Sequence, residues 1–174
     1  AVMEGWLRVE SLDIRELPMA IADFERAVAI DPRYALAYTS LASAEFASYE
    51  STRADLQPAR PLLERAIAHG RQSVHLDESL AEAHGALALI LVSAWDSAGA
   101  IREARRAVAL EPRLAEAHHS YALSLRLFGQ DSAAEAEFRK ALAIDPDRSI
   151  TVENLGQLAL MSGHFAEARR ILDS

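Results

Sequence analysis

The sequence repeats itself every 34 residues, and this period restricts the folds that the chain can adopt. The stretches VALEPRLAEAHHSYALSL and LAIDPDRSITVENLGQLAL carry acid–proline pairs at Pro112 and Pro146, which are 34 residues apart. VAIDPRYALAYTSLA carries the same pair at Pro32, 80 residues before Pro112, which is two periods plus 12. A period of this length is typical of stacked supersecondary units, because one unit alone cannot bury its apolar face.

Each unit has the pattern of two helices. Apolar residues fall at unit positions 4, 7, 8 and 11 and again at 20, 21, 24, 27, 28 and 30, which is helical spacing. Small residues at positions 8, 20 and 27 allow close approach of the helix backbones, and a larger residue at 24 fills the remaining space. The acid–proline pair ends the second helix, since proline disfavours helix in the residue before it. Gly129 and Gly163 fall at position 15, where a tight turn can use positive φ.

The period predicts one array of five units, of which the second contains 12 extra residues. The expected units are about 1–34, 35–80, 81–114, 115–148 and 149–174. The extra residues lie between the helices of the second unit, within SYESTRADLQPARP, and the prolines there predict a long second helix from about Ala59 to about Leu76. The last unit stops part-way through its second helix, which suggests a piece of something longer.

Residues at positions 7, 8, 20, 24, 27 and 32 carry a resemblance to the tetratricopeptide repeat. The matching residues are Leu7, Ala20, Phe24, Ala27 and Pro32; Leu41 and Ala42; Leu87, Ala88, Ala100, Ala104, Ala107 and Pro112; Tyr121, Ala122, Ala134, Phe138, Ala141 and Pro146; and Leu155, Gly156 and Ala168. The chain resembles this family over nearly its whole length. The resemblance implies an all-α fold, a right-handed superhelix of about five helical hairpins with an elongated second hairpin.

Further features resemble one bacterial subgroup of the family. These are the long second unit, LAEAHGALA, the Trp-Asp turn in AWDSAGAIREARRAVAL, and AEAHHSYAL. In that subgroup the repeats follow nucleotide cyclase, winged-helix or kinase domains in multidomain regulators. The first unit departs from the pattern at Glu4 and Arg8, and Trp6 supplies bulk there. We expect its first helix to be displaced or to cap the stack.

The resemblance implies that the first helix of each hairpin lines a concave groove, with positions 2, 5, 6, 9, 12 and 13 facing a ligand. The expected partner-binding residues are Leu36, Thr39, Ser40, Ser43, Phe46, Glu82, Gly85, Leu89, Glu116, His119, Ser120, Leu123, Arg126, Glu153, Asn154 and Gln157. Apolar burial would drive the binding of a peptide, helix or partner domain. Family members that bind acidic tails carry cations at positions 2, 5, 6 and 9, and this chain has no Lys or Arg there, so we expect no acidic-tail partner.

Two other functions remain open. The array can mediate self-association into a homo-oligomer, because the incomplete last unit leaves an apolar edge that another chain can cover. It can also position a substrate for an enzyme of which it is a part. Positions 9 and 12 of the first helices are then buried by another helix or a second copy instead of a ligand.

Composition and motifs exclude several classes of function. The net charge of −8 disfavours nucleic acid and anionic lipid as partners, and no segment has the pattern of a signal peptide or membrane span. We expect a soluble, cytoplasmic protein. The arginines of the second helices alternate with glutamates, which is typical of an ion-paired, solvated face.

We expect no enzyme, no cofactor and no metal. The chain has no cysteine, and it lacks the GxSxG, P-loop and GxGxxG motifs. His84 and His118 share position 4 of adjacent units and His119 follows, but zinc needs three or four ligands and no nearby carboxylate completes a set. We interpret His84 and His118 as structural histidines.

Overall fold

The computed structural model describes residues 14–54 and 59–173, and within them the chain is helical with no strand. A short 3₁₀ turn at Ile14–Glu16 precedes the first α-helix. The helices are α2 (Leu17–Ile30), α3 (Ala35–Ala54), α4 (Arg60–Leu76), α5 (Ala81–Ser93), α6 (Ser97–Leu110), α7 (Ala115–Leu127), α8 (Asp131–Ile144), α9 (Ser149–Met161) and α10 (Phe165–Leu172). Predictions for Glu4, Trp6, Leu7 and Arg8 lie outside the described residues.

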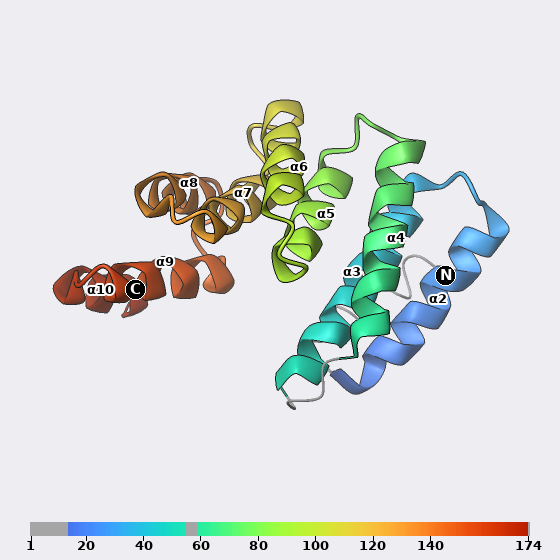
Figure 1. Ribbon diagram of the computed structural model, residues 1–174, viewed down its shortest axis with the longest axis horizontal. Coiled ribbons are helices and arrows are strands. Elements are labelled where there is room, and N and C mark those ends of the chain that lie inside the picture. Colours follow the sequence, from blue (N-terminus) through green and yellow to red (C-terminus); the bar gives the residue numbers. More distant parts are fainter. Residues whose placement is uncertain (1–13, 55–58, 174) are drawn as a thin grey trace.

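The helices pair into successive antiparallel hairpins that stack along the array (Figure 1). The hairpins are α3/α4, α5/α6, α7/α8 and α9/α10, and α2 packs against α3 at the N-terminal end. We call α3, α5, α7 and α9 the A helices and α4, α6, α8 and α10 the B helices. The predicted all-α superhelix of hairpins is confirmed.

Alanines at unit positions 8, 20 and 27 are buried between the helices. Each of the following is completely buried: Ala20, Ala42, Ala66, Ala88, Ala100, Ala107, Ala122, Ala134, Ala141 and Ala168. At position 24 the side chains of Phe24 and Phe138 are also completely buried, so a large group fills the space that the alanines leave. In the last hairpin a Cβ on Gly156 would lie 2.6 Å from Leu172 Cδ2, so this position too requires a minimal side chain.

The A-to-B turns of the last three hairpins share one geometry. The N–H groups of Asp96, Gln130 and His164 each donate to the carbonyl five residues earlier, at 3.0, 3.0 and 2.8 Å. This is the Schellman closure of a helix end, and it places the preceding residue in the left-handed region. Gly129 and Gly163 have φ of 67° and 77° there, as their position predicts.

The first of these turns carries Trp95 instead of glycine, at φ 60°. The left-handed conformation costs a residue with a Cβ roughly 1–2 kcal/mol. The sequence period places Trp95 at the same position as the glycines, but the backbone geometry becomes evident only in the structure.

The predicted long second helix of the elongated hairpin is confirmed as α4, which begins at Arg60 and ends at Leu76. The expected location of the insertion between the helices needs correction. Helix α3 has 20 residues where α5 has 13, and α4 has 17 where α6 has 14, so most of the extra residues extend the two helices. The second hairpin is therefore longer rather than more loosely connected.

Two buried histidine–glutamate pairs, one period apart, hold the A and B helices of their hairpins together. His84 Nδ1 lies 2.8 Å from Glu103 Oε2, and His118 Nδ1 lies 2.7 Å from Glu137 Oε2. The hydrogen bond from His84 lowers the pKa of Glu103, an effect opposed by burial and reinforced by Arg102. The interpretation of His84 and His118 as structural is confirmed.

Candidate partner-binding surface

All sixteen predicted partner-binding residues lie on the four A helices, α3, α5, α7 and α9. The structure separates them into two groups. Five are buried between helices: Thr39, Ser40, Gly85, His119 and Ser120. The other eleven reach the surface, and we call them the A-helix wall: Leu36, Ser43, Phe46, Glu82, Leu89, Glu116, Leu123, Arg126, Glu153, Asn154 and Gln157.

The buried group occupies unit positions 5 and 6, where the A helices pack on their neighbours. Thr39 Oγ1 lies 2.7 Å from Ser73 Oγ of α4, and the hydroxyl of Ser120 donates to the carbonyl of Ala117 at 3.0 Å. A Cβ on Gly85 would be 3.8 Å from Ser120 Oγ, so a bulky residue there would disturb the α5–α7 contact. These five residues therefore support the fold, and a partner cannot reach them in the way that the sequence predicted.

His119 is the most polar member of the buried group and is 3% exposed. Its Nδ1 lies 2.8 Å from Thr151 Oγ1 of α9, and its ring centroid lies 5.6 Å from that of Phe138. Burial lowers the pKa of His119 to about 4, so the ring is neutral at pH 7. His119 connects adjacent hairpins and does not orient a ligand.

Apolar side chains on three consecutive A helices form the middle of the A-helix wall. Phe46, Leu89 and Leu123 are each half-buried, so part of each side chain remains available to solvent. The Phe46 ring is stacked against Tyr49 at a centroid distance of 6.4 Å, which fixes its orientation. The wall thus presents apolar surface on preorganised helices.

Polar groups lie on the same wall towards α9. Arg126 Nη1 donates to Asn154 Oδ1 at 3.3 Å, which joins α7 to α9, and Glu116 forms an ion pair with Arg148. Glu82 and Glu153 are exposed, and no ion pair involves either within the described residues. Four of the predicted polar residues, Glu116, Arg126, Glu153 and Asn154, therefore lie on α7 and α9, whereas Glu82 lies on α5.

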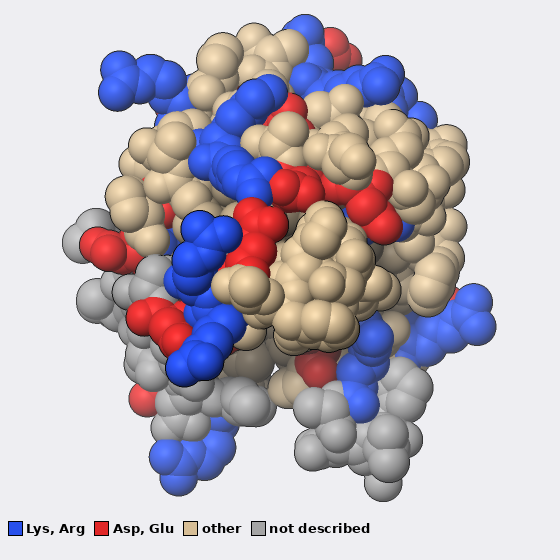
Figure 2. Space-filling view, turned by 90° about the vertical axis from the view of Figure 1, so that its left-hand side faces the viewer, with Lys and Arg blue, Asp and Glu red and all other residues tan. Residues whose placement is uncertain are grey.

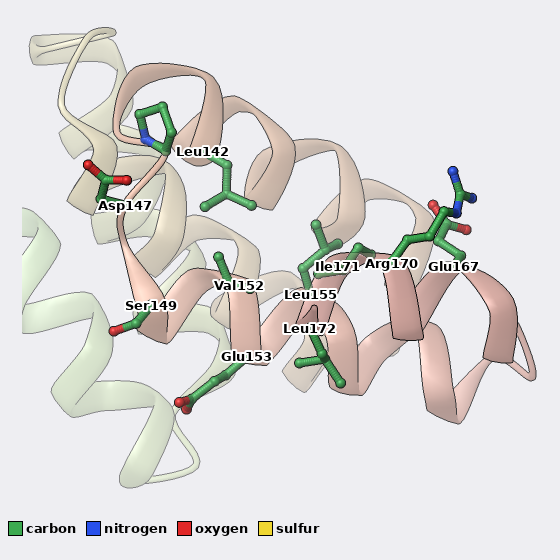
Figure 3. Close-up of a pocket in the computed structure, with 11 residues that line it drawn as sticks. Leu142, Asp147, Ser149, Val152, Glu153, Leu155, Glu167, Arg170, Ile171 and Leu172 are labelled. Atoms are coloured by element: carbon green, nitrogen blue, oxygen red, sulfur yellow. The ribbon is translucent and has the colours of Figure 1, made fainter. Parts of the chain in front are cut away.

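A cavity of about 800 Å³ lies between α8, α9 and α10 (Figure 3). The side chains of Leu142, Val152, Leu155 and Ile171 turn towards one another inside it. Of the predicted residues only Glu153 contributes to its lining. Sequence reasoning missed this cavity because the expectation concerned the A helices alone, whereas α10 and the α8–α9 turn supply most of the lining.

The end of the molecule formed by α8–α10 exposes large apolar side chains. They are Ile150, Leu160, Met161, Phe165 and Leu172, of which Met161 is 77% and Phe165 69% exposed. In Figure 2, where this end faces the viewer, an area of uncharged residues lies near the centre, with charged side chains along its left and upper edges. We call these five residues the C-terminal apolar face.

Arginines of the B helices lie beside glutamates, as Figure 2 shows for the blue and red side chains. Arg139 forms ion pairs with Glu135 and, at 2.6 Å, with Glu167 of the next B helix. Arg65 joins Glu25 of α2 to Glu45 of α3, also at 2.6 Å. The predicted ion-paired face is confirmed for these residues.

No group of three or more His, Asp and Glu side chains in the described residues is arranged to hold a metal ion. No helix in residues 14–54 and 59–173 combines the length and the apolar character needed to cross a membrane.

Comparison with known proteins identifies the class of fold. Residues 115–148 match the family model of the tetratricopeptide repeat. No curated protein matches the sequence. Residues 115–148 are thus a tetratricopeptide repeat, and the described chain has the fold of a tetratricopeptide-repeat protein.

Several solved structures share this fold at low sequence identity. TTC0263, a thermophilic tetratricopeptide-repeat protein of Thermus thermophilus, has a TM-score of 0.80 and 22% identity over 98% of this chain and 88% of its own. PilW, a type IV pilus biogenesis factor, has a TM-score of 0.72 and 20% identity, over 97% of this chain and 73% of its own. YrrB, described as having an unusual peptide-binding site, has a TM-score of 0.58 and 19% identity, over 95% of this chain and 79% of its own.

The buried state of His119 predicts a loss of stability in acid. Its folded pKa of about 4 lies below the ordinary 6.5, so the unfolded chain takes up the proton first as the pH falls. The neutral His119 ring makes its full contribution to the free energy of unfolding above pH 6.5. This contribution, on the order of 3 kcal/mol, is lost as the pH falls from 6.5 to 4. Urea unfolding against pH should show this loss in the wild type and in a His75→Gln control, but not in His119→Gln. Equal pH dependence in all three proteins would contradict the assignment.

Proposed function

We propose that this chain is a protein-interaction module whose A-helix wall holds a peptide or helix of a partner protein, as part of a larger bacterial regulatory protein. The tetratricopeptide-repeat fold supports a scaffold role. YrrB, a structural neighbour, is described as having a peptide-binding site. The resemblance of the elongated hairpin and the Trp-Asp turn to repeats of multidomain regulators supports the regulatory setting.

One observation carries the proposal: apolar side chains on three successive A helices are only half-buried by the fold. Phe46, Leu89 and Leu123 lie on α3, α5 and α7 at positions that the family resemblance assigns to the groove, and each is half-buried. A row of this kind offers a partner apolar area on rigid elements, so binding orders little of the module itself. Helix-in-groove recognition and extended-peptide recognition both use such rows of anchors.

The polar residues of the wall suit orientation more than affinity. Arg126 and Asn154 are already hydrogen-bonded to each other, so a ligand that displaces this contact must replace it. Glu82 and Glu153 are exposed, and they would favour a partner with basic residues at the rim. The net charge of −8 acts in the same direction.

The substitution Leu89→Asp should abolish binding at the wall, because it places a charge in the middle of the apolar row. The probe is a displayed library of random peptides selected on the wild-type protein. We expect wall-binding clones to lose at least tenfold in affinity for Leu89→Asp and to keep affinity for Ile144→Asp, a matched control on α8 that is 39% exposed. Failure of every selected clone to distinguish these two variants would contradict the proposal, provided that both retain the helicity of the wild type.

The C-terminal apolar face favours a second candidate function, homo-oligomer assembly. Met161 and Phe165 flank the α9–α10 turn and are 77% and 69% exposed, and exposed apolar groups that gather in this way mark interaction surfaces in soluble proteins. We expect the mass measured by light scattering to rise with concentration, and the double substitution Met161→Asp and Phe165→Asp to hold the protein monomeric. A wild type that is monomeric at every concentration would exclude this function.

A further inference from the structure

Trp95 adopts a backbone conformation that the array elsewhere gives to glycine. Its φ of 60° matches those of Gly129 and Gly163, which close the two following hairpins. Glycine adopts this region without steric cost, whereas a bulky residue there is an outlier. A strained residue of this kind is a reason to look for a functional role.

The fold gains little from the side chain in return for this strain. Trp95 is 80% exposed, and no hydrogen bond or ring contact of its indole occurs within residues 14–54 and 59–173. Its turn is closed by backbone bonds that glycine makes equally well, since Gly129 and Gly163 make them. Stability therefore does not explain a tryptophan at this position.

Trp95 is one of the residues that line a cleft of about 480 Å³ between the C-terminal half of α3, the N-terminal half of α4 and the end of α5. Its apolar lining, which we call the floor, consists of Tyr49 in the C-terminal half of α3 and of Leu63 and Ile67 on α4. Ala94, which precedes Trp95 in the sequence, also contributes to the lining. Tyr49 and Leu63 are 8% and 9% exposed, so the floor is firmly packed. We call this the Trp95 cleft. It contains no residue of the A-helix wall.

Arg60 and Glu64 both contribute to the lining of the Trp95 cleft. Arg60 Nε lies 3.6 Å from Glu64 Oε1, and no hydrogen bond joins the two side chains. Their exposed fractions are 87% for Arg60 and 68% for Glu64. Such a solvated ion pair is weak, so a carboxylate of a partner can bind the guanidinium group of Arg60 with little loss of interaction energy between Arg60 and Glu64. The neighbouring Glu50 is already bound by Arg53 and Ser93 at 3.0 Å each.

We propose that the Trp95 cleft is a second partner-binding site, which receives a large apolar side chain of a partner polypeptide next to an acidic residue bound by Arg60. Trp95 and Tyr49 enclose the apolar anchor, as aromatic residues do at the energetic centres of interfaces. The cleft volume lies within the range of ligand sites and exceeds that of one leucine or phenylalanine side chain. The proposal is independent of the A-helix wall, which selects basic rather than acidic partners.

The first test is the effect of Trp95→Gly on stability. Because glycine relieves the strain and removes little buried surface, Trp95 being 80% exposed, the urea midpoint should stay constant or rise, with an unchanged helical circular dichroism spectrum. A matched control, Gly129→Ala, introduces the same strain into the next hairpin and should lower the midpoint. A lower midpoint for Trp95→Gly would show that the tryptophan supports the fold and would overturn the proposal.

The second test measures binding with the same displayed random-peptide library, selected on wild-type protein. We expect one class of clones to carry Leu, Ile, Met or Phe beside Asp or Glu, and to lose at least tenfold in affinity for Trp95→Gly and for Arg60→Ser. This class should keep its affinity for Leu89→Asp, which separates the site from the A-helix wall. Recovery of no clone that depends on Trp95, or of Trp95-dependent clones that lack an apolar anchor, would overturn the proposal.

Tryptophan fluorescence locates the contact directly. The chain has two tryptophans, so Trp6→Phe leaves Trp95 as the single reporter. A synthetic peptide from the selected class should shift its emission to shorter wavelength as the exposed indole becomes buried. An unchanged spectrum at saturating peptide would overturn the assignment of Trp95 to the contact.

Discussion

Contact between alanine-sized residues on neighbouring helices is the interaction on which this structure depends. Completely buried alanines occupy all three positions in two hairpins, as Ala88, Ala100 and Ala107 do in α5/α6 and Ala122, Ala134 and Ala141 do in α7/α8. Backbones that approach this closely gain dense dispersion contact along their whole length. The same contacts fix the angle between successive hairpins, so they also determine where the surface residues lie.

The close approach limits which residues can contact a partner. Gly85 and Ser120 face each other across α5 and α7, and His119 reaches Thr151 of α9, so these residues at positions 5 and 6 belong to the hairpin junctions. On α9 the same two positions, Glu153 and Asn154, reach the surface. The outer surface of the A helices is left with a row of half-buried apolar residues and a polar end. The edge formed by the A-to-B turns carries a second apolar site, which includes Trp95. Two surfaces of opposite charge preference would let one small array hold two partners.

The sequence predicts most of the fold because the period, the helical spacing and the small residues all indicate the same hairpins. It predicts the extent of α4 from two prolines and the left-handed turns from Gly129 and Gly163. It does not predict which groove residues are buried, since Ser40 and Ser43 are the same residue type at two groove positions of one helix, yet Ser40 is buried and Ser43 reaches the surface. The sequence does not predict the Trp95 cleft either, because Tyr49, Leu63 and Trp95 come from three different helix ends.

The unfolding free energy of Ala100→Leu tests the central claim most directly. Ala100 is completely buried on α6, whereas Ala109 on the same helix is exposed, so Ala109→Leu is a control with the same change in helix propensity. We predict a loss of roughly 1–3 kcal/mol for Ala100→Leu, because three added carbons must separate packed helices, and a change within about 0.5 kcal/mol for Ala109→Leu. Equal stabilities of the two variants would contradict the claim that alanine-sized contacts hold the array together.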